Sequence, residues 1–176
     1  KNNKNAFIFN ADKESKKHLK KSQSLQKKII NTFGQRVVSN NKLNLDLLAE
    51  KAFSDETNHK ILNGLLWPEI FNIISNKYEE IKITNKKLFV VDAALIFEAN
   101  FNSFFDTNLL ITATESTRID RAISRKNISL ESIQNRIALQ MSDNKKKQIA
   151  DHTILNNGSI ESFYKKLEKF YKKIKF

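Results

Sequence analysis

The alternation of apolar and polar positions near the start of the chain predicts a buried strand followed by a helix. Residues 6–9 (Ala-Phe-Ile-Phe) form a short apolar run with aromatic and β-branched side chains, which is typical of a strand. From about 13 to 33, apolar residues recur with helical spacing among many lysines, and Gly34 stands where a helix C-cap is expected. Asp12 lies between the two predicted elements.

Helical spacing continues through the middle of the chain. Three segments have apolar residues three and four positions apart: 43–53, 57–66 and 68–83. Pro68 fits the first turn of the third predicted helix, where its missing N–H costs nothing. We therefore expect a helical insertion after the first strand.

Strands and helices alternate again in the second half. Three further apolar runs have the length and composition of strands: 88–92, 108–113 and 152–155. The segments between and after them have helical spacing: 115–126, 130–140 and 159–176. Ser129 and Ser159 are suited to cap two of these helices. Strands joined by helices form parallel sheets. We therefore predict a three-layer α/β fold that is built on a parallel sheet and has a helical insertion.

Ligands of parallel sheets bind at the carboxyl ends of the strands, which directs attention to Asp12, Asp92 and the turn at 156–158. Asp12 is either a helix N-cap or a carboxylate that accepts a proton or holds a metal ion, and the cap is the simpler interpretation. The turn Asn156-Asn157-Gly158 is either a tight turn that uses positive φ angles or a group that hydrogen-bonds a flat base, and the tight turn is favoured.

Arginine is rare in this lysine-rich chain, yet four arginines lie close together in sequence: Arg118, Arg121, Arg125 and Arg136. Arg121 and Arg125 are four residues apart, so they share a helix face, and a planar guanidinium can bind two phosphate oxygens at once. A solvated helix face that pairs with nearby carboxylates explains the same spacing equally well. Trp67 is either a core residue, the favoured interpretation, or a stacking platform.

Composition narrows the classes of protein. Of 176 residues, 31 are basic and 19 acidic, giving a net charge of +12, and 40% are hydrophobic, which is enough for a packed core. The absence of cysteine excludes disulfides, thiolate metal sites and a cysteine nucleophile. No stretch approaches the roughly 20 apolar residues of a membrane span. The sequence thus predicts a soluble, cytoplasmic protein without membrane contact, whose charge suits anionic ligands.

A basic nucleic-acid binder is the hypothesis that the charge alone suggests. Lysine is spread along the whole chain, and no recognisable nucleic-acid-binding module accompanies it. We therefore do not expect nucleic acid as a partner.

Taken together, the motifs resemble those of the dephospho-coenzyme A (dephospho-CoA) kinase family over essentially the whole chain. The residues that carry the resemblance occur in the family's order: Ala11-Asp12-Lys13, Phe33-Gly34, Ala94 to Glu98, Arg121 with Arg125, Arg136 with Gln140, Ala150-Asp151 and Asn156-Asn157-Gly158. The resemblance implies ATP-dependent phosphorylation of the ribose 3′-hydroxyl of dephospho-CoA, the last step of CoA biosynthesis, with ATP and Mg²⁺.

The resemblance also implies an organisation and a set of roles. The P-loop nucleotide-kinase core would comprise residues 1–32, 87–113 and 141–176, with a helical CoA-substrate domain at 33–86 and a helical lid at 114–140. The implied catalytic residues are Asp12, Arg121 and Arg125, with Asp12 as the base and the arginines on the transferring phosphoryl group. The implied binding residues are Arg136, Gln140, Asn157 and Gly158 for ATP, Leu95, Phe97, Glu98 and Trp67 for the acceptor, and Asp92 for the metal ion.

The chain departs from the family's pattern in several places. Four residues replace the family's usual Asp, Arg, His and Pro: Asn10, Leu45, Trp67 and Ala94. No G-x-x-x-x-G-K-[ST] motif is present, so the phosphate-binding loop is absent from this sequence. We expect roughly 25 residues, the usual length of a strand, a loop and a helix, to precede Lys1, and we expect the chain alone to be inactive.

The alternative to the kinase is a catalytically inactive P-loop relative or fragment that binds adenine-containing ligands or a partner. We expect a monomer or a weak oligomer.

Overall fold

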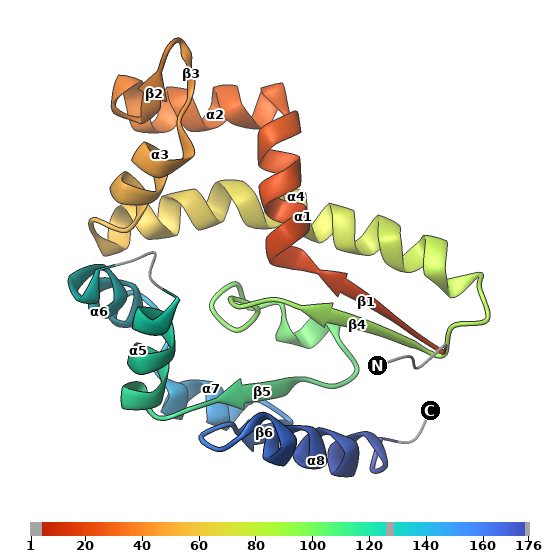
Figure 1. Cartoon of the computed structure of the whole chain (residues 1–176). Coiled ribbons are helices and arrows are strands. Elements are labelled where there is room, and N and C mark those ends of the chain that lie inside the picture. The colour runs from red at the N-terminus through yellow and green to blue at the C-terminus, as the bar shows by residue number, and fades with distance from the viewer. Residues whose placement is uncertain (1–4, 126–128, 175–176) are drawn as a thin grey trace. The chain divides into compact units, whose positions relative to one another are not determined.

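The computed structural model describes residues 5–125 and 129–174 and divides the chain into two compact units, Lys1–Leu95 (unit 1) and Ile96–Phe176 (unit 2). Each unit contains a pair of parallel strands. In unit 1, β1 (Ala6–Asn10) pairs with β4 (Leu88–Asp92), and in unit 2, β5 (Leu109–Thr112) pairs with β6 (His152–Leu155) (Figure 1). The predicted α/β class, with parallel strands joined by helices, is confirmed.

The helices of unit 1 lie between the parallel strands β1 and β4 in sequence. In order they are α1 (Ala11–Lys21), α2 (Gln23–Phe33), the 3₁₀ helix Gly34–Val37, a hairpin of β2 (Val38–Ser39) with β3 (Lys42–Leu43), α3 (Leu45–Ala52) and α4 (Glu56–Lys82). Gly34, with φ of 74°, ends α2 as predicted. The hairpin was not predicted.

The prediction of a single helix over about 13–33 is wrong, because the helix is interrupted at Ser22. The backbone of Ser22 is extended, and its hydroxyl accepts a hydrogen bond from the N–H of Leu25 at 3.3 Å. Ser22 therefore caps a new helix. Leu19 before the break and Leu25 after it are both buried in one cluster, so the break lets two helices contribute to the same core.

The separate helices predicted for 57–66 and 68–83 are also wrong, since α4 runs through both segments. Pro68 lies inside this helix, and its missing N–H leaves the carbonyl of Gly64 without its usual intrahelical donor. Apolar packing on both sides of Pro68 outweighs that loss. Leu62, Leu65 and Leu66 pack against one cluster of unit 1, and Ile70 and Ile74 belong to another.

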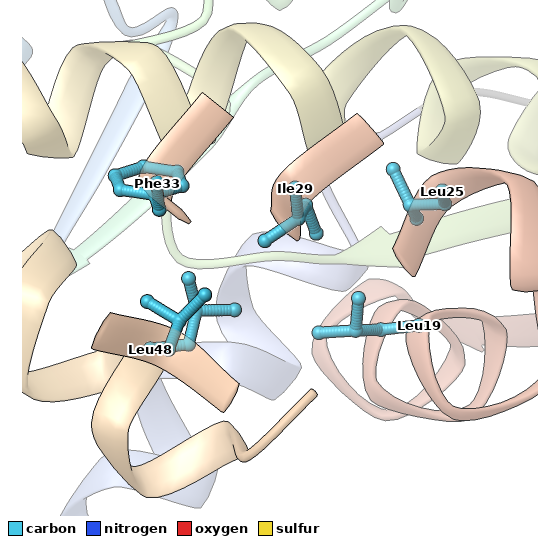
Figure 2. Packing of buried hydrophobic residues seen from close by; sticks show 6 residues of the cluster. Leu19, Leu25, Ile29, Phe33 and Leu48 are labelled. Atoms are coloured by element: carbon cyan, nitrogen blue, oxygen red, sulfur yellow. The ribbon is translucent and has the colours of Figure 1, made fainter. Parts of the chain in front are cut away.

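The first of these clusters joins α1, α2 and α3. Leu25, Ile29 and Val37 are wholly buried in it, together with Leu19, Phe33 and Leu48 (Figure 2). Burying one such side chain stabilises the fold by about 1.5–3 kcal/mol. This cluster therefore holds α1, α2 and α3 together.

The second cluster packs one face of the β1–β4 pair against α4. Phe9, Ile70 and Ile74 are buried there, and Phe89 packs against them. Ile8 points to the opposite face of the strand because side chains alternate, and it is 69% exposed. The predicted burial of β1 therefore holds for one face of the strand and not for the other.

Unit 2 alternates strands with short helices. In order they are the 3₁₀ helix Asn102–Phe104, β5, α5 (Glu115–Ser124), α6 (Leu130–Ala138), α7 (Asp143–Ile149), β6 and α8 (Ile160–Tyr171). Ser129 and Ser159 cap α6 and α8 as predicted. Helix α7 was not predicted; Ser142 caps it. The helix ends predicted at Lys126 and Phe176 lie outside the described residues.

Across residues 5–125 and 129–174, no helix combines the length and apolar character that crossing a bilayer requires.

Candidate active site

The parallel strands of unit 1 end side by side at Asn10 and Asp92, which are register partners. The side-chain amide of Asn10 donates a hydrogen bond to Oδ2 of Asp92 at 3.1 Å. Its Oδ1 accepts the backbone N–H of Lys13 at 2.8 Å, which makes Asn10 the N-cap of α1. The favoured interpretation of Asp12 as the N-cap is therefore wrong, because Asn10 already fills that role.

Asp12 lies in the first turn of α1, at the carboxyl end of β1, and solvent reaches its side chain. Desolvation by the surrounding residues raises the pKa of Asp12 above its usual value, and the negative charge of Asp92 raises this pKa further. Lys16 and a backbone hydrogen bond from Ala94 oppose the rise without cancelling it. Asp12 thus keeps its proton to a higher pH than an ordinary aspartate, a property that suits a general base.

Removing the charge of Asp92 tests this electrostatic coupling. In an Asp92→Asn variant, the pKa of Asp12 should move down toward its ordinary value, because the second cause of its rise is gone while desolvation remains. The carboxyl resonance of Asp12, followed by NMR as a function of pH, gives the midpoint directly. A Glu14→Gln variant removes a carboxylate from the same helical turn and should leave that midpoint unchanged. An unshifted midpoint in Asp92→Asn would refute the coupling.

Two further residues of unit 1, Leu95 and Trp67, were predicted to belong to the site, and they lie on different segments of the chain. Leu95 is half-buried, three residues beyond Asp92. Trp67 is half-buried inside α4, next to Pro68. The acidic pair Asp12 and Asp92 is thus the part of the predicted site that unit 1 brings together.

In unit 2, Arg121 of α5 holds the turn that follows β6. Its Nη1 donates to the carbonyl of Asn156 at 2.8 Å, and its Nη2 donates to the carbonyl of Gly158 at 3.4 Å. Oδ1 of Asn157 accepts the backbone N–H of Thr114, which follows β5, at 2.9 Å. The turn is therefore tied to the carboxyl ends of both strands, where parallel sheets bind their ligands. Arg121, Asn157 and Gly158 are brought together as one group.

The backbone of this turn differs from the favoured interpretation. Neither Asn157 nor Gly158 has a positive φ. A Cβ atom on Gly158 would meet Oγ of Ser162 at 3.5 Å, an ordinary contact distance. The fold of the chain itself therefore does not require glycine at this position.

A second arginine of α5 lines a cavity of about 370 Å³ together with Gln140. Nη1 of Arg118 lies 3.4 Å from Oδ1 of Asp143, and the hydroxyl of Thr112 donates to the other oxygen of that carboxylate. Nε of Arg118 is buried without a hydrogen-bond partner among the described residues. Asp143 was not predicted, because its partners are distant in sequence. The sequence around Arg118 does not indicate this contact.

Of the four arginines between 118 and 136, the other two, Arg125 and Arg136, lie in exposed positions. Arg125 is the C-cap of α5, and Arg136 lies in the last turn of α6. Residues 126–128, which belong to the predicted lid at 114–140, lie outside the described residues.

Glu98 is held in a buried ion pair inside unit 2. Its Oε1 lies 2.6 Å from Nζ of Lys146 and accepts the backbone N–H of Met141 at 3.2 Å. The side chains of Glu98 and Lys146 are 11% and 9% exposed. Oε2 of Glu98 is buried without a partner among the described residues. Phe97, the residue before it, is also buried.

Comparisons with known proteins agree on one family. The family model described as dephospho-CoA kinase matches residues 2–162. The dephospho-CoA kinase of Chlamydia caviae is 31% identical over 171 residues, covering 97% of this chain and 85% of that protein. The enzyme of the same name from Lactobacillus acidophilus is 34% identical over 176 residues, covering 98% of this chain and 87% of that protein.

Two solved structures superpose on this chain. The dephospho-CoA kinase of Campylobacter jejuni superposes with a TM-score of 0.61 at 25% identity and covers 94% of this chain and 83% of its own. The protein TT1252 of Thermus thermophilus superposes with a TM-score of 0.74 at 22% identity over 96% of this chain and 85% of its own, so it has the same fold.

Proposed function

This chain belongs to the dephospho-CoA kinase family, and we propose that Asp12 is the base of its reaction. The reaction is the ATP-dependent phosphorylation of the ribose 3′-hydroxyl of dephospho-CoA, the last step of CoA biosynthesis. The observation that supports Asp12 is its carboxylate at the carboxyl ends of β1 and β4, with a raised pKa and no capping role. The comparisons bear out neither the expected inactivity of the chain alone nor the alternative of an inactive relative.

Asp12 would act by accepting a proton. The 3′-oxygen of the acceptor attacks the γ-phosphorus of ATP, its proton passes to the Asp12 carboxylate, and the bond between the γ-phosphorus and the bridging oxygen breaks to release ADP. The backbone hydrogen bond from Ala94 would hold the carboxylate in place for this step. Its raised pKa brings the base closer to the operating pH, which favours proton transfer.

For unit 2 we propose ATP binding at the turn after β6. Asn157 and Gly158 would lie along the adenine, and Gly158 lets a flat ring approach the backbone closely. Arg121 uses two of its five N–H donors on the carbonyls of the turn, which leaves donors for phosphate oxygens. Arg125 would act with Arg121 on the transferring phosphoryl group, and Arg136 and Gln140 would bind the remaining phosphates.

A magnesium ion fits the acidic pair of unit 1. Mg²⁺ is bound through one or two carboxylates and completes its coordination with water and substrate phosphates. Among the described residues, no group of three or more His, Cys, Asp or Glu could hold a metal ion. Asp92 would hold the ion, and a cation there would offset the repulsion that raises the pKa of Asp12. When bound, Mg²⁺ neutralises charge on the phosphate oxygens.

For the acceptor, dephospho-CoA, we propose contacts from Leu95 and Trp67 and from the helical segment 33–86. Both side chains are half-buried, so part of their apolar surface is accessible. Phe97 and the Glu98 side chain are largely buried in unit 2, and we propose that they support the segment 94–98 beside the acceptor.

Incubating the protein with Mg·ATP and dephospho-CoA tests the function. We expect CoA as the product, with one phosphoryl group gained at the 3′-oxygen of the ribose, as identified by mass spectrometry. Phosphorylation of a different acceptor, with dephospho-CoA unchanged, would contradict this function.

An Arg121→Lys variant tests the proposed role of the turn. Lysine cannot donate to both carbonyls from one rigid plane, so the turn should loosen and ATP affinity should fall by about tenfold. Amide hydrogen exchange at Gly158 and Ser159 should become faster in the same variant. Arg125→Lys is the matched control for the exchange measurement, because that residue is exposed at the end of α5. Unchanged exchange in Arg121→Lys would show that the turn does not depend on the guanidinium.

A further inference from the structure

A second cavity of unit 2 lies between β6 and α8 and has a volume of about 230 Å³. The side chains that give it its chemical character are His152, Ile154, Lys166, Lys169, Phe170 and Lys173. The strand and the helix are the last two elements of the chain (Figure 1). Three lysines and one histidine thus surround a small concave space.

Among the described residues, no carboxylate lines this cavity. Asp151, next to His152, accepts hydrogen bonds from the backbone and side chain of Asn108 at 2.7 and 3.2 Å, so it is engaged elsewhere. Lys169 and Lys173 form no ion pair with any described residue. Like charges gathered around one space repel one another, and a bound anion would remove that repulsion.

Aromatic and aliphatic side chains form part of the cavity lining. The ring of Phe170 meets the ring of His152 edge-on, with centroids 5.1 Å apart, and Ile154 is buried. Nζ of Lys166 donates to the carbonyl of Leu155 at 2.6 Å, which fixes this side chain along β6. The space therefore combines a fixed wall with the ammonium groups of Lys169 and Lys173.

We propose that this cavity binds a small phosphate-bearing anion such as inorganic phosphate or pyrophosphate. The ammonium group of lysine binds phosphate oxygens through charge-assisted hydrogen bonds. The cavity starts at His152, the first residue of β6, whereas the turn held by Arg121 follows the last residue. The turn residues Asn156, Asn157 and Gly158 are not among the residues that line the cavity, so this anion site is distinct from the proposed ATP site.

The position of these lysines near the end of α8 has a second physical explanation. A helix C-terminus attracts cations through its dipole, whether or not they surround a cavity. Lys165 and Lys172 are on the same helix or its cap but do not line the cavity. A comparison between the two pairs of lysines separates an anion site from an effect of the helix end.

Pyrophosphate titration of the full chain at low salt, followed by ¹H–¹⁵N NMR, tests the proposal. We expect saturable shifts at the amides of Thr153, Lys169 and Phe170. In a Lys169→Gln/Lys173→Gln variant, the Kd for these shifts should rise by about tenfold or more, since two ammonium contacts are lost. The control variant Lys165→Gln/Lys172→Gln removes the same charge, and its Kd should stay within about twofold.

Three outcomes would overturn the proposal. The first is a titration with no saturable shift at these amides. The second is equal weakening of binding in both double variants, which would indicate a diffuse basic surface. The third is a single-stranded oligonucleotide that displaces pyrophosphate and depends equally on all four lysines, which would assign the surface to nucleic acid. Circular dichroism confirms that both variants are folded before binding is compared.

Discussion

Replacing Asp12 by Asn should lower kcat for dephospho-CoA phosphorylation by about 10²–10⁴-fold, the usual contribution of a positioned general base. The amide has the size of the carboxyl group, and its oxygen can still accept the backbone hydrogen bond from Ala94. It cannot accept the proton of the 3′-hydroxyl. Calorimetry should show ATP affinity within about twofold of the unsubstituted protein, because we place ATP at the turn of unit 2.

The same substitution should not destabilise the protein. Because folding raises the pKa of Asp12, the stability linked to this group is fully present below its unfolded pKa and is lost as the pH rises through the raised folded value. At neutral pH the ionised side chain therefore opposes folding, and Asp12→Asn should raise the thermal midpoint or leave it unchanged. Glu14→Gln, in the same helical turn, should keep full activity. Full turnover in Asp12→Asn would exclude Asp12 as the base.

Replacing Lys146 by Met should lower the free energy of unfolding by about 3–5 kcal/mol, because the carboxylate of Glu98 would remain buried without its charge partner. Methionine fills a similar volume, so the loss reports the ion pair more than a cavity. Urea unfolding, monitored by circular dichroism, measures the change.

Two further variants separate the ion pair from a general effect of losing lysine. Lys145→Met removes an exposed lysine from the preceding position and should change stability by at most about 0.5 kcal/mol. Adding Glu98→Gln to Lys146→Met should recover most of the lost stability, because no buried charge is then left unpaired. Equal losses in Lys145→Met and Lys146→Met would show that the buried pair contributes nothing specific.

The elements that depend on local sequence were predicted well. The strand at 152–155 has both ends where the apolar run placed them, and Ser129 and Ser159 cap the helices that they precede. A short apolar run and a capping hydroxyl act on their immediate neighbours, so the sequence alone contains the information.

The elements that depend on tertiary contacts were not predicted from the sequence. Helix α7 has no apolar stripe, and it is anchored by Lys146, whose partner Glu98 lies far away in the sequence. Lys146 stands within a run of three lysines, Lys145 to Lys147, and nothing in the sequence distinguishes it from its neighbours. Likewise, the break at Ser22 depends on how Leu19 and Leu25 share one core.

In the candidate site, too, the residues at strand ends were predicted from the sequence, and the contacts between distant segments were not. The carboxyl end of β1 indicated Asp12 and the end of β4 indicated Asp92, because strand ends can be located from the apolar runs. The hydrogen bond between Asn10 and Asp92 requires the register of the β1–β4 pair, which the sequence did not specify. The contact of Arg118 with Asp143 requires the packing of α5 near α7, and no local pattern encodes it.

Because α4 continues through Pro68 without interruption, the number of residues in this helix is constrained. At 3.6 residues per turn, each residue advances a helix by about 100°. Leu62, Leu65 and Leu66 face one cluster and Ile70 and Ile74 the other, so the two groups keep a fixed angular phase across the proline. Inserting or deleting one residue there would rotate one group away from its cluster by about 100°. The fold can therefore accept new side chains near Pro68 more readily than a different number of residues.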